Sequence, residues 1–319
     1  MRACLLVLLL AVADPAISET LAVAPASAKA QLPLNGFDVA KHGVPVDKIL
    51  PGGPARDGMA RVDEPRWAAP EEASWVRGDT PVIGFEAGGE SRAIPVHLIE
   101  YHQIVNDEVG GVPVVITFDP ICATPIVYRA QRAGKPMRFG ISGLIYNSNF
   151  LLYDLETESL WSQVLGEAIA GPLTGQKLER LRVHQEPFGV WLGRSPQTRV
   201  LARPMPREID YRHSPYSRYW ISETVPFPVA AKDDKFHPKE VVLGVEVGGV
   251  TRAYLGSVLT AAGGRIVDEV AGHKIRVHYE SEVGNFIWDA PPALLATDSY
   301  WFSWKAFHPD TQIWSDAKR

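Results

Sequence analysis

Short runs of alternating apolar and polar residues, separated by glycine or polar turns, dominate the chain. One such run, Ile83–Ala87, precedes a Gly88-Gly89 pair, and two more, Phe150–Leu155 and Ser159–Val164, flank the polar turn 156–158. Alternation with a period of two buries one face of a strand, and glycine pairs favour tight hairpin turns. The pattern therefore predicts short strands joined into antiparallel hairpins.

The first hairpin motif occurs twice. Ile83–Gly89 recurs as Leu243–Gly249 at a shift of 160 residues, and a short helical pattern follows each copy, at 96–105 and at 256–262. Self-similarity at a fixed shift indicates a repeated structural unit. We therefore expect each copy to form a hairpin followed by a short helix.

Further matches show that the two copies differ in length. Asp107-Glu108-Val109 recurs as Asp268-Glu269-Val270 at a shift of 161, whereas Trp191 matches Trp304 at a shift of 113. The first copy is therefore longer by 161 minus 113, or 48, residues between Phe118 and Trp191. Residues that recur in both copies are expected to serve the shared scaffold.

These patterns predict an α+β fold of mainly antiparallel β-structure, built from two related sheet-rich units with a loop-rich insertion in the first. The predicted order is a signal peptide (1–28), an N-terminal extension (29–80), a first unit (81–202) with its insertion (119–187), a crossover rich in proline and aromatic residues (203–240), and a second unit (241–319).

Composition supports a folded globular protein. Of 319 residues, 46% are hydrophobic and 22% are charged, which excludes the disordered, collagen-like and coiled-coil classes. The net charge of -5 lacks the basic excess expected of proteins that bind phosphate backbones, so no nucleic-acid partner is expected. With 27 Gly and 26 Pro, short strands and many loops are favoured over a helical bundle.

The first residues have the pattern of a secretory signal. Arg2 is followed by the apolar run Ala3–Ala13 and by a small-residue cleavage site, Ala26-Ser27-Ala28. The apolar run is shorter than the roughly 20 residues needed to span a bilayer, so a membrane span is not expected. We therefore predict a periplasmic or secreted protein from which the signal, including Cys4, has been removed.

The loss of Cys4 would leave Cys122 as the only thiol, and no internal disulfide could form. Cys122 is then either a small buried hydrophobe or a reactive or metal-binding thiol. With Asp119 three residues earlier after a strand, it forms a candidate catalytic pair. The same pair could bind zinc or copper if histidines completed the site, and His102, His184 and His278 are the candidates.

Polar and aromatic residues in the insertion form a second set of candidates. On one strand Trp161 and Gln163 share a face, and Tyr153 could face the same pocket from the paired strand. Loops held by a rigid sheet often contact ligands. The candidate ligand-binding residues are Ser142, Asn147, Asn149, Tyr153, Trp161 and Gln163. A buried tryptophan with its indole N–H satisfied explains the aromatic position equally well.

Several ordered motifs resemble a bacterial family of exported proteins, domain of unknown function 3179. They are Phe118–Cys122, Phe139–Leu144, Leu152–Asp154, Ser159–Gln163 and Gly166–Gly175, within a likeness over roughly 81–314. The family pattern commonly has Cys-Pro-Leu-Cys where this chain has Asp119-Pro120-Ile121-Cys122. The resemblance therefore implies that a paired-thiol redox mechanism is lost here, because no second cysteine remains.

Two functional hypotheses follow. In the first, the protein has a metal- or thiol-dependent site centred on Cys122 and Asp119, which binds a small molecule or a metal ion and is conceivably catalytic. In the second, it is a non-catalytic binding module for a glycan, a peptide or a partner protein, bound through the insertion or through the aromatic run Tyr211–Trp220. A buried Cys122 would favour the second hypothesis, and an open cleft containing a histidine would favour the first.

Overall fold

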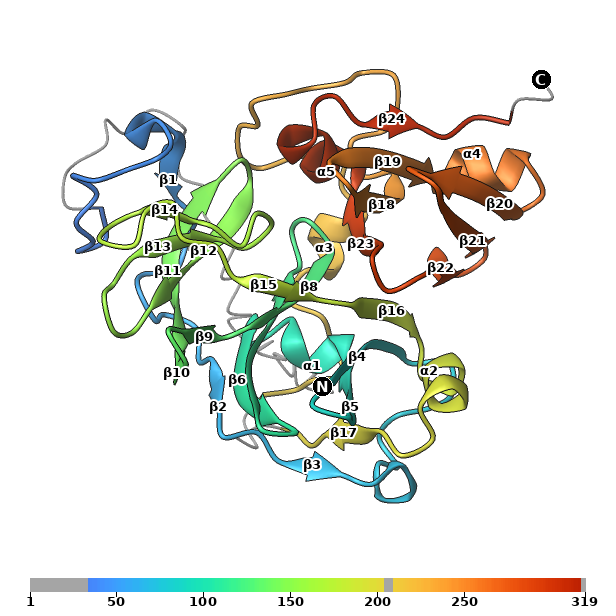
Figure 1. Cartoon of the computed structure of the whole chain (residues 1–319), viewed down its shortest axis with the longest axis horizontal. Coiled ribbons are helices and arrows are strands. Elements are labelled where there is room, and N and C mark those ends of the chain that lie inside the picture. Colours follow the sequence, from blue (N-terminus) through green and yellow to red (C-terminus); the bar gives the residue numbers. More distant parts are fainter. Residues whose placement is uncertain (1–33, 204–208, 317–319) are drawn as a thin grey trace, which may run out of the picture.

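The computed structural model describes residues 34–203 and 209–316, so the predicted signal peptide lies outside the described residues. The protein is mostly β, with largely antiparallel sheets and a few short helices. In Figure 1 the first sheets lie at the bottom, the inserted sheet at the left and the C-terminal sheets at the upper right. None of the helices within 34–203 and 209–316 is long and apolar enough to cross a membrane.

The first predicted unit contains two sheets. One has the order β16-β4-β5-β17-β3, with bounds Val183–Pro187, Pro81–Ala87, Glu90–Pro95, Arg199–Leu201 and Trp67–Ala68. The other has the order β15-β8-β7-β6-β2, with bounds Glu179–Leu181, Thr124–Arg129, Val112–Asp119, Ile104–Val109 and Val62–Asp63. Helices α1 (Val96–Ile99) and α2 (Phe188–Arg194) complete the unit.

The second predicted unit also contains two sheets. One has the order β23-β18-β19-β24, with bounds Leu295–Tyr300, Val241–Val247, Val250–Leu255 and Gln312–Ile313. The other has the order β20-β21-β22, with bounds Arg265–Val270, His273–Glu280 and Asn285–Asp289. Helices α4 (Gly256–Ala261) and α5 (Trp301–Phe307) occupy places along the chain that match those of α1 and α2.

The predicted hairpins are confirmed. Strands β4 and β5 pair through Gly88-Gly89, and β18 and β19 pair through Gly248-Gly249. All four glycines have positive φ, which residues with a Cβ rarely adopt. The first predicted helix is shorter than expected: α1 ends at Ile99, and the β-branched residues that follow Gln103 begin β6 instead.

The segment inserted into the first unit is narrower than predicted. Strand β8 pairs with β7 as β22 pairs with β21, and β16 pairs with β4 as β23 pairs with β18. The connection between β8 and β16 covers 130–182, or 53 residues, against 290–294, or five residues, between β22 and β23. The difference of 48 residues equals the excess found in the sequence. Cys122 therefore lies outside the inserted segment, in the β7–β8 turn, which corresponds in these pairings to the β21–β22 turn of the second predicted unit.

The inserted segment forms a sheet of its own. Its order is β1-β11-β12-β13-β14, with bounds Ile49–Pro51, Phe139–Tyr146, Asn149–Asp154, Leu160–Ser162 and Ala168–Ala170. A small exposed hairpin, β9 (Gln131–Arg132) and β10 (Lys135–Pro136), precedes it. Because β1, β2 and β3 come from the predicted N-terminal extension, that segment adds edge strands to three sheets.

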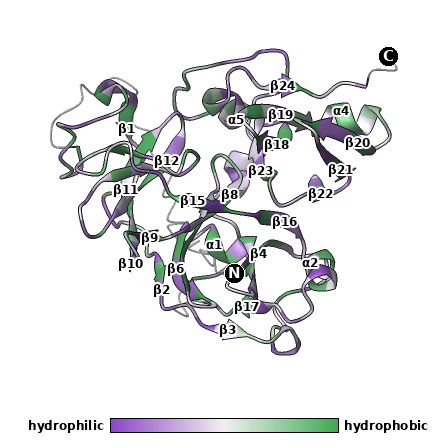
Figure 2. Cartoon of the chain, viewed as in Figure 1, coloured by the Kyte–Doolittle hydropathy of each residue, from purple (hydrophilic) through white to green (hydrophobic). Residues whose placement is uncertain are grey.

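Two sheets enclose a hydrophobic core in each predicted unit. Phe85, Ile94 and Ile116 belong to the first core, and Val245 and Trp288 belong to the second. A further core lies between β6–β8 and the inserted sheet. Figure 2 shows hydrophobic and hydrophilic residues mixed along many strands, as expected of strands that bury one face against a core.

The crossover contains little regular structure. Within its described residues it has one short helix, α3 (Ser217–Trp220). The remaining regular elements are two 3₁₀ turns in the N-terminal extension, Val46–Lys48 and Pro70–Glu72. Frequent prolines explain the irregular backbone, because proline lacks an N–H group and disfavours helix at the residue before it.

A tryptophan packs on a glycine in each of the two predicted units. A Cβ at Gly84 would lie 2.3 Å from the ring of Trp191, and a Cβ at Gly244 would lie 2.2 Å from the ring of Trp304. The indole N–H of Trp191 donates to Thr198 Oγ1 at 3.0 Å, as that of Trp304 donates to Thr311 Oγ1. Because each glycine lacks a side chain, the indole ring can pack directly against its backbone.

Replacing either glycine by alanine should destabilise the protein. We expect Gly84→Ala and Gly244→Ala each to lower the free energy of unfolding by about 2–3 kcal/mol, because a buried indole must move. Urea unfolding would measure the loss. Gly193→Ala in α2 is the matched control, since a Cβ there meets nothing within 4 Å. Equal effects at all three positions would contradict the packing argument.

Candidate functional site

The candidate pair lies where β7 turns into β8. Asp119 is the last residue of β7 and faces Thr124 across the hairpin, with Cys122 in the turn between them. Asp119 Oδ1 accepts hydrogen bonds from the backbone N–H groups of Ile121 at 2.8 Å and Cys122 at 3.2 Å. A carboxylate that binds backbone donors two and three residues ahead stabilises a tight turn.

The second oxygen of Asp119 binds the inserted sheet. Oδ2 accepts from the side-chain amide of Asn149 at 2.7 Å and from the backbone N–H of Phe150 at 3.0 Å. Asn149 also donates to Gln163 Oε1 at 2.8 Å, and Gln163 donates to Thr117 Oγ1 and to the Thr124 carbonyl, each at 3.0 Å. Asp119, Asn149 and Gln163 therefore form one network that joins the first unit to its insertion.

The Cys122 thiol is enclosed in this network. Its side chain has no exposed surface, and Sγ donates to the Ser148 carbonyl at 3.2 Å. Burial raises the pKa of the thiol well above its usual range, and the Asp119 carboxylate raises it further. Because the thiolate is the nucleophile, a thiol held protonated is poorly suited to attack a substrate.

Three buried oxygens around the thiol have no hydrogen-bond partner among the described residues. They are the hydroxyls of Ser148 and Ser303 and the amide oxygen of Asn149. Ser303 and Asn149 lie close enough to the thiol to favour its ionised form, although burial outweighs them. Ser148 has a φ of 64°, an uncommon conformation outside glycine. Unpaired buried oxygens are costly, so this cluster could bind a water molecule or a small polar ligand.

The second predicted unit covers the turn from one side. The backbone N–H of Tyr300 donates to the Cys122 carbonyl at 2.9 Å, and Thr124 Oγ1 donates to the same carbonyl at 2.9 Å and to Ser299 Oγ at 3.1 Å. Ser299 and Tyr300 end β23, and Ser303 lies in α5. Sequence reasoning missed these three residues because they are about 180 positions from Cys122 and form no motif with it.

The crossover covers the turn from another side. The Tyr219 hydroxyl donates to the Ile121 carbonyl at 2.8 Å, and the Trp220 indole donates to the Pro120 carbonyl at 3.1 Å. Upstream, Gln103 donates to the Tyr216 hydroxyl at 3.2 Å. The polar ends of these three rings therefore bind the protein itself, which leaves them poorly placed to act as a sugar-binding surface.

The predicted metal ligands do not meet. Both ring nitrogens of His102 have partners, the Ala60 carbonyl and the Tyr211 hydroxyl, whereas His184 stacks on Trp288 at 4.3 Å between ring centres. Burial, assisted by two nearby arginines, lowers the pKa of His184 to about 3. Within the described residues no three His, Cys, Asp or Glu side chains converge on a possible metal position, so neither histidine completes a site with Asp119 and Cys122.

The third candidate, His278, lies in β21 opposite Arg265 of β20. That sheet belongs to the second predicted unit, whereas the candidate pair lies in the β7–β8 turn of the first. Among the described residues, His278 thus belongs to no group of three metal-binding side chains.

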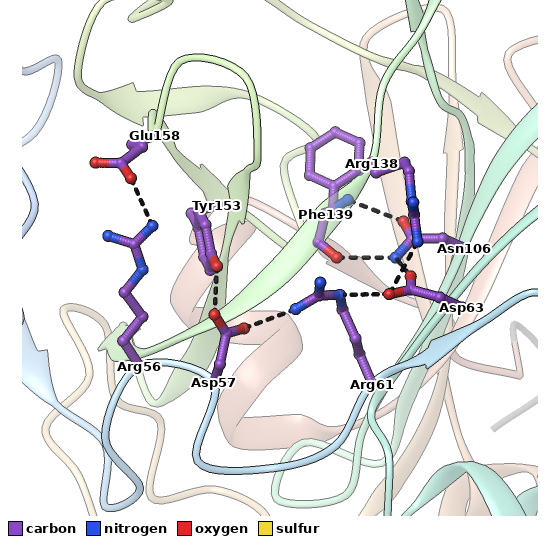
Figure 3. A network of polar contacts seen from close by, with 9 residues as sticks. All are labelled: Arg56, Asp57, Arg61, Asp63, Asn106, Arg138, Phe139, Tyr153 and Glu158. Atoms are coloured by element: carbon purple, nitrogen blue, oxygen red, sulfur yellow. Dashed lines mark hydrogen bonds and ion pairs between the residues drawn. The ribbon is translucent and has the colours of Figure 1, made fainter.

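Four of the six predicted ligand-binding residues use their polar groups elsewhere. Ser142 donates to the Leu151 carbonyl, Asn147 accepts from the backbone N–H of Ala230, and the Trp161 indole donates to Asp154. The Tyr153 hydroxyl donates to Asp57, within a network of charged side chains that joins the N-terminal extension to the inserted sheet (Figure 3). Only Asn149 and Gln163 reach the Asp119 network.

Two shallow hollows lie beside edge strand β3. The first, of about 470 Å³, is lined by Arg66, Ser74, Trp75, Ala202 and Arg203, and the second, of about 580 Å³, by Trp67, Gly89, Glu90, Ser91, Arg92, Gln197 and Arg199. In the first, the indole N–H of Trp75 is buried without a partner among the described residues. The arginines that line the two hollows could bind an anionic group.

Comparison with known proteins agrees with the motifs. The family described as protein of unknown function (DUF3179) matches residues 56–291, which is most of the chain. No curated protein and no solved structure matches the chain. The matched span includes the β7–β8 turn, strands β11–β14 of the inserted sheet and most of the second predicted unit. The chain therefore belongs to the DUF3179 family of proteins of unknown function.

Proposed function

We propose that the protein is a non-catalytic binding module rather than a thiol-dependent enzyme. The observation that supports this is the state of Cys122, whose thiol is fully buried, donates to a backbone carbonyl and has no histidine among its partners. A nucleophilic cysteine needs a nearby base and access to substrate. The Asp119–Cys122 turn then has a structural role, since it joins the first unit, the inserted sheet and the second unit.

Thiol labelling tests this role. We expect Cys122 in the native protein to react at least a hundredfold more slowly with a thiol reagent than in urea, because the buried thiol is protonated. Mass spectrometry would follow the labelling. As a matched control, Ser281→Cys places a thiol at an exposed position in the β21–β22 turn. Rapid labelling of native Cys122 would contradict the proposal.

The proposed ligand is anionic, such as an acidic peptide or an acidic glycan. Arg66 and Arg203 line one hollow without an ion-pair partner among the described residues, and Arg199 lines the other. Trp75 adds an aromatic wall to the first hollow. Charge-assisted hydrogen bonds from arginine suit carboxylate and sulfate groups, and flat aromatic walls suit sugar rings or apolar side chains.

Binding of defined anions tests the ligand class. We expect a hexaglutamate peptide or a galacturonate oligomer to bind, and Arg66→Gln/Arg203→Gln to weaken binding about tenfold or more, as loss of two charge-assisted contacts predicts. Calorimetry or fluorescence anisotropy would measure the affinity. Arg132→Gln, on the exposed β9 strand, is the control for net charge. Equal weakening by both variants would show only a non-specific charge effect and contradict the site.

A second candidate function rests on the three unpaired oxygens around Cys122. Together with the thiol they could bind a small polar ligand or a metal ion, such as zinc or copper, if the crossover moved away. Metal analysis of purified protein is its test. Stoichiometric metal that is lost in Cys122→Ser would support this function, whereas metal below stoichiometry and unchanged by the substitution would reject it.

Two further proposals concern the whole chain. We infer that it is exported after removal of 1–28, as its N-terminal pattern suggests. A mature chain that begins near Lys29, found by mass spectrometry of the secreted or periplasmic fraction, would support export. We also infer that 81–202 and 241–319 are related units, because the Gly84–Trp191 and Gly244–Trp304 contacts and the strand pairings match.

A further inference from the structure

The two halves differ at one sheet edge. In the first half β2 covers the outer edge of β6, where Val62 lies opposite Val105 and Asp63 opposite Asn106. The matching strand of the second half, β20, is an edge strand with β21 as its neighbour (Figure 1). An uncovered strand edge offers unpaired backbone groups to another strand.

The exposed side chains of β20 alternate. Arg265, Val267 and Glu269 are exposed, and Val267 has 62% of its surface exposed, whereas Asn106 at the matching place in β6 has 6%. Val267 is one of the few large apolar residues that the described surface exposes to this extent. The strand thus presents a positive, an apolar and a negative residue in a row.

The outward-facing backbone groups of β20 lie on the same three residues. The two-residue turn Ala271-Gly272 closes β20 on β21, so Val270 and His273 form a hydrogen-bonded pair. Hydrogen-bonded pairs then recur at every second residue of β20. The hydrogen bond from the Tyr279 N–H to the Gly264 carbonyl at 2.8 Å fits this spacing. Even-numbered residues bind β21, and odd-numbered residues direct their N–H and carbonyl groups outward. The Glu269 N–H binds Asp268 Oδ1 at 2.8 Å.

We propose that β20 pairs with β20 of a second copy of this chain, antiparallel about a twofold axis at Val267. Val267 then faces its counterpart with two backbone hydrogen bonds, and Arg265 of each copy lies opposite Glu269 of the other. The apolar contact and both ion pairs form at once, because the row of charges is complementary to its own reverse. This complementarity identifies a second copy as the partner.

The paired edges extend the three-stranded sheet of each copy into a continuous six-stranded sheet. A contact made by one strand pair is small, so the dimer is a weak one that depends on concentration. The Glu269 N–H exchanges its bond to Asp268 for one across the axis, which adds little net stability. The inference does not depend on the proposed anion-binding function, since β20 and the hollows beside β3 lie in different sheets.

Sedimentation equilibrium of the purified full chain tests this dimer. We expect a monomer–dimer equilibrium in which Arg265→Glu or Glu269→Arg alone raises the dissociation constant about tenfold or more, because two like-charge pairs replace two ion pairs. The double variant should return it to within about threefold of the native value, because the pairs re-form with reversed sign.

Two more variants separate this contact from other causes. Val267→Pro removes only an outward N–H and should abolish the dimer with the fold kept, as thermal unfolding would show. Arg132→Glu makes the same charge change on the exposed β9 strand and should leave the dimer intact. A monomer at every concentration, a dimer indifferent to the β20 variants, or a double variant that stays dissociated overturns the proposal.

Discussion

Asp119→Ala should lower the free energy of unfolding by about 4 kcal/mol. The Asp119 side chain is 2% exposed, and its two oxygens accept four hydrogen bonds, three of them from backbone N–H groups. Removing the carboxylate leaves these donors buried without partners, and each unsatisfied donor costs about 1–3 kcal/mol when the site cannot fully relax. Urea unfolding followed by tryptophan fluorescence would measure the loss.

Two further variants provide comparisons for the stability loss expected of Asp119→Ala. Asp119→Asn keeps one acceptor oxygen and should lose about half as much stability, because its amide group then faces the donors of Asn149 and Phe150. Glu108→Ala removes an exposed carboxylate from the neighbouring strand β6 and should change stability by less than about 0.5 kcal/mol. If all three variants unfolded at the same urea concentration, the turn would not join the units as inferred.

Asp298→Asn should stabilise the protein at alkaline pH, by roughly 5 kcal/mol at pH 9, because a rise of about four pKa units is worth about 1.4 kcal/mol per unit. Burial, with the buried carboxylate of Glu186 as a smaller cause, raises the pKa of Asp298 to about 8. In the unfolded chain the pKa is near 3.8. Folding must therefore keep this carboxyl protonated or bury its charge.

The sign of the pH dependence follows from this raised pKa. The contribution of Asp298 to stability is complete below about pH 4 and is lost as the pH rises through about 8, because the unfolded chain releases the proton first. The native protein and Asp298→Asn should thus differ little below about pH 4 in urea unfolding, and the difference should grow between about pH 4 and 8 and level off above that. Asp289→Asn, at an exposed ion pair with Arg276, is the control. A difference independent of pH would contradict the assignment.

The local elements could be predicted from the sequence because their causes are local. Glycine pairs at 88–89 and 248–249 set the hairpin turns, and alternation placed β4 and β12 in the sheets. The repeat also gave the 48-residue excess of the first half. The predicted boundaries of the insertion, 119 and 187, were less accurate. Strand pairing, which the sequence does not display, shows that β8 and β16 correspond to β22 and β23 of the second predicted unit and so lie outside the insertion.

The candidate site shows the limit of sequence reasoning more clearly. Asp119 and Cys122 were found because they are neighbours in a motif, and Asn149 and Gln163 because they lie in dense polar segments. The predicted histidines lie elsewhere, because residue type indicates what a side chain can bind and not where the fold brings it. Ser299, Tyr300 and Ser303 carried no signal at all.

The sequence by itself determined that this is a β-rich member of the DUF3179 family with a hairpin motif that occurs twice and one thiol beyond its predicted signal peptide. Only the tertiary structure decided that this thiol is buried, protonated and covered by the crossover and the second half. The physical reason is that composition and spacing record chemistry along the chain, whereas burial and pKa depend on which distant segments pack together.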